Sequence, residues 1–151
     1  MISLSRKLFF AVEAVMYIAY NASSNPVSSK EIAGKQKLPP RYLEQMMQRL
    51  VRAGILRGVR GPRGGYLLAR ERRRIGIAEI CDILQKADAE NPEEINVPST
   101  TLGIRIVQPL WDQMNAQAMA HLKPITIADL CEKAETLQIR KTSEEKLDFS
   151  I

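Results

Sequence analysis

The feature that most constrains the fold is a glycine-rich stretch near the middle of the chain, residues 59–68 (VRGPRGGYLL). Three glycines and one proline lie there between two short apolar runs. Glycine reaches positive φ without a Cβ clash and proline presets a turn, so the stretch predicts a tight β-hairpin. Its tip carries Arg60 and Arg63 and no carboxylate. The hairpin is therefore expected to present positive charge, either to an anionic partner or simply to solvent.

The segment before the hairpin predicts two short helices in close succession. Ser28 and Glu31 have the spacing of a capping box, so a helix is expected to follow Ser28 and to end near Lys35. Two prolines then break the chain. The second, Pro40, suits the first turn of a new helix because its missing N–H has no intrahelical partner there. Gly54 is the expected end of this second helix.

The second of these helices has an apolar and a polar face. Its expected core positions are Leu43, Met46 or Met47, and Leu50. Polar side chains at spacings of three and four share the opposite face: Tyr42, Gln45, Arg49 and Arg52. Amides and guanidinium groups suit base edges in the major groove, and outer arginines suit phosphates. Two short helices followed by a basic hairpin are typical of a winged helix-turn-helix, in which the hairpin is the wing.

Further helices are expected on both sides of this unit. The first follows Ser5 and has a broad apolar stripe. Four arginines among residues 70–74 form a run that is expected to be solvated or to lie along phosphates, with specific base contact the less favoured reading. A helix then begins at Gly76 and ends near Lys86. The similar string at residues 125–131 is interpreted as a second helix start of the same kind, capped by Thr126, and not as a duplicated domain.

The last third of the chain predicts a long helix that a second copy would cover. Residues 88–100 are acidic, contain two prolines and have no periodicity, so they are expected to form a connecting loop. From about Thr101 a helical stripe follows, with Pro109 either in its first turn or at a kink. The expected dimer interface is Ile104, Val107, Leu110, Trp111, Met114, Ala118, Met119 and Leu122. A helix that packs only on its own domain is the alternative. A final helix is expected from Ile127 to Thr136.

Positive charge is concentrated in the first part of the chain. Residues 1–87 contain 16 basic and 6 acidic residues, whereas residues 88–151 contain 6 basic and 11 acidic residues. The basic part is a candidate surface for a polyanion, and the acidic part is not. No apolar run approaches the roughly 18 residues of a membrane span, and the N-terminus lacks the signal-peptide pattern. A cytoplasmic location without membrane attachment is expected.

Several stretches together resemble bacterial Rrf-type regulators, winged-helix transcription factors that include IscR, NsrR, RirA and CymR. In chain order they are Ser5-Arg6-Lys7, residues 28–33, Tyr42-Leu43-Glu44-Gln45, residues 50–55, Val59-Arg60-Gly61-Pro62 and Gly64-Gly65-Tyr66-Leu67-Leu68. Residues 42–45 and the glycine-rich hairpin form a specific combination, and the resemblance extends from about residue 2 to Ala134. It implies a homodimer in which each subunit reads half of a palindromic promoter site on double-stranded DNA.

The resemblance also implies which residues meet DNA. In that family the helix holding Tyr42, Glu44 and Gln45 enters the major groove, and the wing arginine, here Arg60, reaches the minor groove. Arg41 stands where IscR-like members often carry a smaller polar residue, so a different target sequence is expected. The residues expected to contact DNA are Ser28, Arg41, Tyr42, Glu44, Gln45, Gln48, Arg49, Arg52, Arg60, Gly61, Pro62, Arg63, Gly64 and Tyr66.

One departure from the family pattern concerns iron. Many members hold an iron–sulfur cluster through three cysteines in the loop before the dimer helix, with a histidine or carboxylate as the fourth ligand. Residues 88–104 contain no cysteine or histidine here, and the first helix offers Arg6 and Lys7 in place of an acid. Because such clusters need thiolates, neither a cofactor nor a metal site is expected. The single histidine, His121, is expected at the surface or at a helix end.

The two cysteines, Cys81 and Cys131, lie just inside expected helices beside apolar neighbours. Cysteine in such positions usually behaves as a small core residue, and reduced thiols are expected in the cytoplasm. A redox or metal role is the alternative interpretation.

The sequence as a whole predicts a mainly α protein with a small β-hairpin wing. Residues 1–87 are expected to form a winged helix-turn-helix domain, 88–100 an acidic loop, 101–137 a dimerisation helix and a C-terminal helix, and 138–151 a polar, flexible tail. The expected function is that of a homodimeric, sequence-specific DNA-binding repressor. The alternative is a regulator that binds a metabolic enzyme through its dimer or winged-helix surface. An enzyme is not expected, because the chain has one histidine and its glycine-rich stretch lacks the Lys-Ser/Thr of a phosphate loop.

Overall fold

A computed structural model describes residues 6–21, 24–90 and 98–142. Its helices are α1 (Arg6–Asn21), α2 (Ser29–Gln36), α3 (Pro40–Arg52), α4 (Ile77–Glu90), α5 (Gln108–Leu122) and α6 (Ile127–Thr136), with a 3₁₀ turn at Arg72–Arg74 and a π-helical turn at Gly103–Val107. Strands β1 (Leu56–Val59) and β2 (Gly65–Leu68) pair antiparallel, with Leu56 opposite Leu68 and Val59 opposite Gly65. The predicted fold class, mainly helical with one hairpin, is confirmed.

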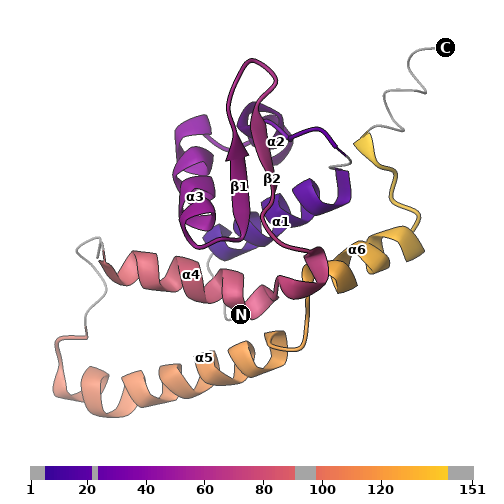
Figure 1. The fold of residues 1–151 in the computed structure, drawn as a ribbon. Coiled ribbons are helices and arrows are strands. Elements are labelled where there is room, and N and C mark those ends of the chain that lie inside the picture. Colours follow the sequence, from indigo (N-terminus) through magenta and orange to yellow (C-terminus); the bar gives the residue numbers. More distant parts are fainter. Residues whose placement is uncertain (1–5, 22–23, 91–97, 143–151) are drawn as a thin grey trace.

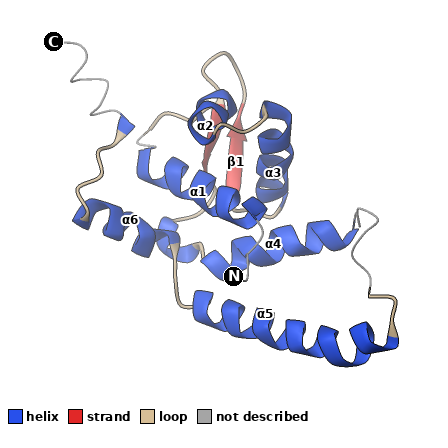
Figure 2. Ribbon diagram, turned by 180° about the vertical axis from the view of Figure 1, so that it is seen from behind, coloured by secondary structure: helices blue, strands red, loops and turns tan. Residues whose placement is uncertain are grey.

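The elements form a head and an arm (Figure 1). The head contains α1, α2, α3 and the hairpin, with the hairpin tip at the end farthest from α5. Helix α4 crosses the base of the head, where it contacts α1 and α3, and α6 packs against α1. Helix α5 runs back alongside α4 and contacts it, so that these two helices form the arm seen from both sides in Figures 1 and 2.

One apolar core joins the head to the base of the arm. Its fully buried members come from α1, α2, α3, β1, α4 and α6, and they include Ile18, Ile32, Leu43, Leu50, Leu56, Leu84 and Ile127. Both Met46 and Met47 are buried, where the sequence offered one or the other. Phe9, which the sequence places in the apolar stripe of α1, is instead 63% exposed. It lies on the side of α1 that borders an apolar groove described below.

The caps predicted for two helices are present in the structure. The Ser28 hydroxyl accepts a hydrogen bond from the Glu31 backbone N–H at 3.1 Å, and Thr126 and Asp129 form a complete capping box at the start of α6. The Glu31 carboxylate accepts from the Tyr17 hydroxyl at 2.7 Å, so the side chain that was expected to complete the first capping box ties α2 to α1.

Helix α4 is longer than the sequence predicts. It continues to Glu90 and not only to about Lys86, so the first residues of the predicted 88–100 loop are helical. Asp88 in this additional turn is held by cationic side chains of two other helices, which local sequence patterns do not reveal. Residues 91–97, the centre of the predicted loop, lie outside the described residues.

The π-helical turn accommodates Pro109 near the start of α5. The Gln108 N–H donates to the carbonyl of Gly103, five residues back, so the turn before the proline is wider than an α-helical one. A proline cannot donate the next helical hydrogen bond and its ring crowds the preceding turn. A widened turn directly before Pro109 lets the helical course continue through it.

The two similar strings at residues 75–81 and 125–131 meet in space. The Ile77 N–H donates to the Ile125 carbonyl and the Ile127 N–H donates to the Ile75 carbonyl, both at 2.9 Å. Gly76 and Thr126 therefore form an isolated antiparallel bridge directly before α4 and α6. This bridge fixes the two ends of the arm next to each other.

The chain after α6 is attached to α1 as far as residue 142. The Tyr20 hydroxyl donates to the Ile139 carbonyl at 2.5 Å, and the Thr142 N–H donates to the Asn21 side chain at 2.8 Å. The Tyr17 hydroxyl also lies 2.9 Å from that of Thr142. The first part of the predicted flexible tail is thus an ordered strap on α1, and residues 143–151 lie outside the described residues.

Candidate nucleic-acid interface

Helix α3 presents a polar face to solvent. The side chains of Arg41, Tyr42, Glu44, Gln45, Gln48 and Arg52 are exposed, and the opposite face carries the four buried residues of this helix. Residues 41, 45, 48 and 52 recur at spacings of four and three and form the centre of the exposed face. Tyr42 and Arg49 lie at its border towards α4. The face thus presents two glutamines flanked by arginines, a donor and acceptor set that suits base edges and phosphates.

The wing tip is built by glycines whose positions the geometry requires. Gly61 adopts φ of +112°, a region that L side chains rarely enter. A Cβ on Gly64 would lie 2.2 Å from the Val59 carbonyl oxygen, so the turn closes only without a side chain there. Arg60, Pro62 and Arg63 are exposed around these glycines. The turn therefore projects two guanidinium groups beyond the strands.

A third backbone segment holds the wing against the head, and sequence reasoning missed it. Tyr66 and Val27 exchange two backbone hydrogen bonds, of 2.8 and 3.0 Å, so the residue before Ser28 acts as a short third strand. The Tyr66 side chain is half-buried, and burial, followed by the nearby Glu44 carboxylate, raises its pKa. Tyr66 thus orients the wing relative to α2 and α3. Ser28 has its hydroxyl engaged in the helix cap.

The arginine run at residues 70–74 stabilises the base of the hairpin. Arg70 donates to the carbonyls of Gly54 and Arg74 and forms an ion pair with Glu79 at 2.6 Å. Arg73 pairs with Glu71 at 2.5 Å. These contacts join the end of α3, the 3₁₀ turn and the start of α4. Arg70 and Arg73 are therefore less available to bind phosphates than the sequence of this run suggests.

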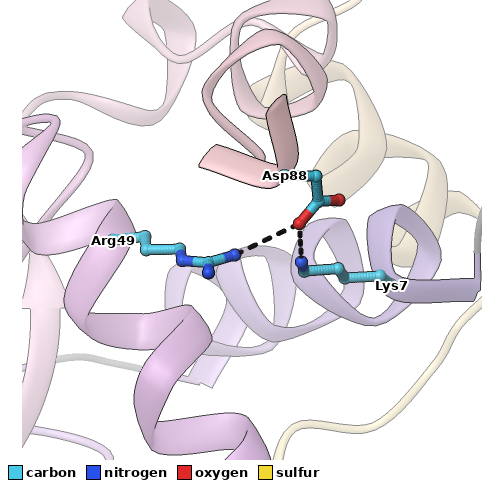
Figure 3. Close-up of polar contacts among 3 residues, drawn as sticks. All are labelled: Lys7, Arg49 and Asp88. Carbon is cyan, nitrogen blue, oxygen red and sulfur yellow. Dashed lines mark hydrogen bonds and ion pairs between the residues drawn. The ribbon is translucent and has the colours of Figure 1, made fainter. Parts of the chain in front are cut away.

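Arg49 forms part of an ion-pair cluster of three helices (Figure 3). The Asp88 carboxylate of α4 accepts from Lys7 of α1 and lies 3.4 Å from the Arg49 guanidinium of α3, through the same oxygen. Tyr42 is nearby: burial and then the Asp88 charge raise its pKa, while Arg49 lowers it. The sequence placed Asp88 in a loop and Arg49 among free DNA contacts, so this cluster was not predicted.

The predicted dimer-interface residues divide into two groups. Ile104, Val107, Leu110 and Trp111 are between 52% and 57% exposed, whereas Met119 and Leu122 pack against the core of their own chain. Met114 and Ala118 are half-buried, as Met119 and Leu122 are. Leu102 and Ile106 are also exposed, at 73% and 64%, and the periodicity missed them because the π-helical turn shifts the register. The segment from Leu102 through the π-helical turn to the start of α5 therefore carries an apolar surface, named here the arm patch: Leu102, Ile104, Ile106, Val107, Leu110 and Trp111.

An apolar groove of about 510 Å³ lies between α1, α4 and the end of α5. It is lined by Leu8, Phe9, Val12, Glu13, Met16, Ile77, Cys81 and Leu122. Glu13 is the single ionisable side chain on this lining apart from the thiol, so the groove suits an apolar partner.

Both cysteines are buried: Cys81 is 3% exposed, and Cys131 is fully shielded from solvent. Burial raises the pKa of each thiol, which favours the protonated form.

Among the helices that the structure describes, none combines the length and the apolar composition that a membrane span requires.

Comparisons with known proteins agree with this arrangement. The model of the Rrf2 family, described as an iron-dependent transcriptional regulator, matches residues 4–133. The HTH-type transcriptional regulator IscR of Cronobacter sakazakii is 30% identical over 138 residues, covering 90% of this chain and 84% of that protein. The structure of T. potens IscR matches with a TM-score of 0.69 at 30% identity, covering 95% of this chain and 96% of the other.

A second solved structure is that of CymR, the global cysteine regulator of B. subtilis, with a TM-score of 0.64 at 27% identity over 88% of this chain and 98% of that one. These relatives are named as regulators, the Cronobacter sakazakii protein as a transcriptional regulator, and not as enzymes. The helix-turn-helix head, the glycine-dependent wing and the agreement along nearly the whole chain lead to one conclusion: the protein is a transcriptional regulator of the Rrf2 family.

Proposed function

We propose that the protein is a homodimeric repressor that binds a palindromic DNA site without an iron–sulfur cluster. The observation that carries this proposal is the joint presentation of the exposed face of α3 and the arginine-tipped wing on one head. Amides on α3 suit base edges in the major groove, and Arg60 at the wing tip suits the adjacent minor groove. The excess of basic residues in residues 1–87 supplies attraction to phosphates.

The arm patch supports the homodimer. Six large apolar side chains, each more than half exposed, occupy consecutive turns from Leu102 to the start of α5. Soluble monomers rarely expose so many large apolar side chains within one short segment, and the commonest way to cover them is a two-fold contact with a second copy. The groove beside α1 gives the same chain a second apolar surface for that partner. Two heads joined in this way suit two half-sites related by a dyad.

The proposal that the protein works without an iron–sulfur cluster follows from the side chains that could act as ligands. An iron–sulfur cluster needs several thiolates, and this chain has two cysteines. Both are buried in the core with raised pKa values, and residues 88–104 contain neither cysteine nor histidine. The residues present do not fit the cluster. Anaerobic purification is expected to give protein without a visible absorption band, and a coloured, iron-containing dimer would contradict this part of the proposal.

DNA binding is tested by fluorescence anisotropy with a duplex from the region upstream of the protein's own gene. Binding is expected to weaken steeply with salt, because each phosphate contact contributes about −0.9 to the log–log slope. Arg60→Gln should make the slope shallower, whereas Arg73→Gln, which removes an arginine paired with Glu71, should leave it near the wild-type value. Wild-type protein that fails to bind, or binds independently of salt, would refute the proposal.

Repression is inferred because a small dimer seated on promoter DNA excludes other proteins from it sterically. A reporter fused to the same upstream region should be expressed more strongly when the regulator is deleted. Lower expression on deletion would identify an activator.

A further inference from the structure

Asp88 is placed where it can affect the cationic edge of α3. It lies in the last turn of α4, and its carboxylate binds Lys7 of α1 and Arg49 of α3 through one oxygen. The Asp88 side chain is 51% exposed and that of Arg49 is 28% exposed. The Arg49–Asp88 pair is therefore partly accessible to solvent and to a ligand that approaches α3 from that side. Figure 3 shows the two side chains meeting between α3 and α4.

Arg49 belongs to the same helix face as the predicted DNA contacts. It follows Gln45 by four residues and precedes Arg52 by three, so it is their neighbour on the surface of α3. Tyr42, one further turn towards the start of the helix, is close enough to respond to both charges of the pair. The carboxylate therefore faces the border of the proposed DNA surface.

A carboxylate and a DNA phosphate are competing ligands for one guanidinium group. Both accept charge-assisted hydrogen bonds from arginine. Ion pairs that are this exposed contribute little net stability, so a phosphate can displace such a carboxylate at small cost. While the internal pair persists, Arg49 does not neutralise a phosphate, and Asp88 adds a negative charge beside the approaching DNA.

We propose that Asp88 limits the affinity of the protein for DNA by holding Arg49 in an internal ion pair. The inference rests on the proposed DNA binding. Asp88 acts through Arg49 and does not itself touch DNA. It therefore changes the affinity for DNA and not the base sequence that is recognised.

The test is the substitution Asp88→Asn, measured by anisotropy over a series of salt concentrations. Release of Arg49 should lower Kd by about three- to fivefold, the range accessible to an exposed ion pair. One additional phosphate contact should steepen the log–log salt slope by about 0.9. Asp82→Asn is the matched control, because it removes the same charge from an exposed residue of α4 that pairs with Lys86.

The decisive comparison adds Arg49→Gln. Combined with Asp88→Asn, this change should abolish both the gain in affinity and the steeper salt slope that Asp88→Asn produces alone. Asp88→Glu, which keeps the charge, should bind like wild type. Thermal unfolding of each variant is the check on the fold, and the melting temperature of Asp88→Asn should stay close to that of wild type because the Asp88 side chain is 51% exposed.

Three results would overturn the inference while leaving the proposed function intact: weaker DNA binding by Asp88→Asn, a gain no larger than that of Asp82→Asn, or a gain that persists in the Arg49→Gln background. Absence of wild-type binding to the duplex would instead refute the proposed function, and the inference with it.

Discussion

At Gly65 the wing packs closely against the backbone of the segment that precedes α2. A Cβ at this position would lie 2.3 Å from the Val27 carbonyl oxygen and 2.8 Å from the Ser28 nitrogen. Both neighbours are backbone atoms and cannot move aside as a flexible side chain would. Gly58, on the facing strand, has no atom within 4 Å of the corresponding Cβ position.

Gly65→Ala is therefore expected to destabilise the protein by about 1–3 kcal/mol, the usual cost of an added group in a filled space. The loss should appear in urea denaturation, together with weaker DNA binding because the wing is displaced. Gly58→Ala, the matched control, should change the stability by no more than about 0.5 kcal/mol. Equal stability of the two variants would show that Gly65 is not constrained in this way.

Asp129 gives the stability of α6 a dependence on pH. Hydrogen bonds from the backbone N–H and the hydroxyl of Thr126 hold the pKa of this carboxyl below its usual value. A carboxyl with a lowered pKa in the folded state stabilises the fold above its unfolded pKa of about 4, and that contribution is lost as the pH falls through the folded pKa.

The melting temperature of Asp129→Asn should thus lie below that of wild type at neutral pH, and the gap should close as the pH falls below about 4. Asp112→Asn measures the effect of removing a negative charge elsewhere in the same part of the chain. A gap of constant size from pH 7 to pH 2 would contradict the assignment.

At the scale of elements, helix ends were predictable wherever the signal is local. The caps at Ser28 and Thr126 place the starts of α2 and α6 correctly, because the cap and its partner are three residues apart. The glycines of the hairpin likewise specify the turn. The strands, α3 and the fold class follow from the same kind of short-range pattern.

Features that depend on distant residues were not predictable. Asp88, in the last turn of α4, contacts Lys7 and Arg49, which are 81 and 39 residues away. The third strand-like contact at Val27 and the strap at Thr142 also join segments far apart in sequence. For the candidate site, the exposed faces were foreseen, whereas the engagement of Arg49 and Arg70 in internal ion pairs was not.

The arm patch predicts that the start of α5 takes part in a dimer contact. Trp111→Glu places a charge in the centre of the proposed dimer contact, where desolvation is costly, so the variant should shift from dimer to monomer in sedimentation equilibrium. Gln113→Glu is the matched control, because residue 113 comes two positions after Trp111 and therefore lies on nearly the opposite side of the helix. A wild-type protein that sediments as a monomer, or a Trp111→Glu variant that remains dimeric, would contradict the proposed interface.

At the scale of the whole molecule, a two-headed dimer is sensitive to the spacing of its half-sites. The proposed homodimer would hold its two heads at a fixed separation, and DNA turns once in about 10.5 base pairs. Inserting five base pairs at the centre of the operator rotates one half-site to the opposite side of the duplex. Affinity should therefore fall to that of a single half-site, and an insertion of ten should restore part of it, as measured by anisotropy. Equal binding to all three spacings would indicate heads that act independently.

The bridge between Gly76 and Thr126 has a consequence for changes in the length of the chain. The bridge holds the start of α4 next to the start of α6. The length of the connection between α4 and α5 therefore does not determine where these two starts lie. Doubling the length of such a loop costs only about 0.6 kcal/mol in closure entropy. Changes in the length of the chain after Glu90 should therefore leave the head in place and cost little stability.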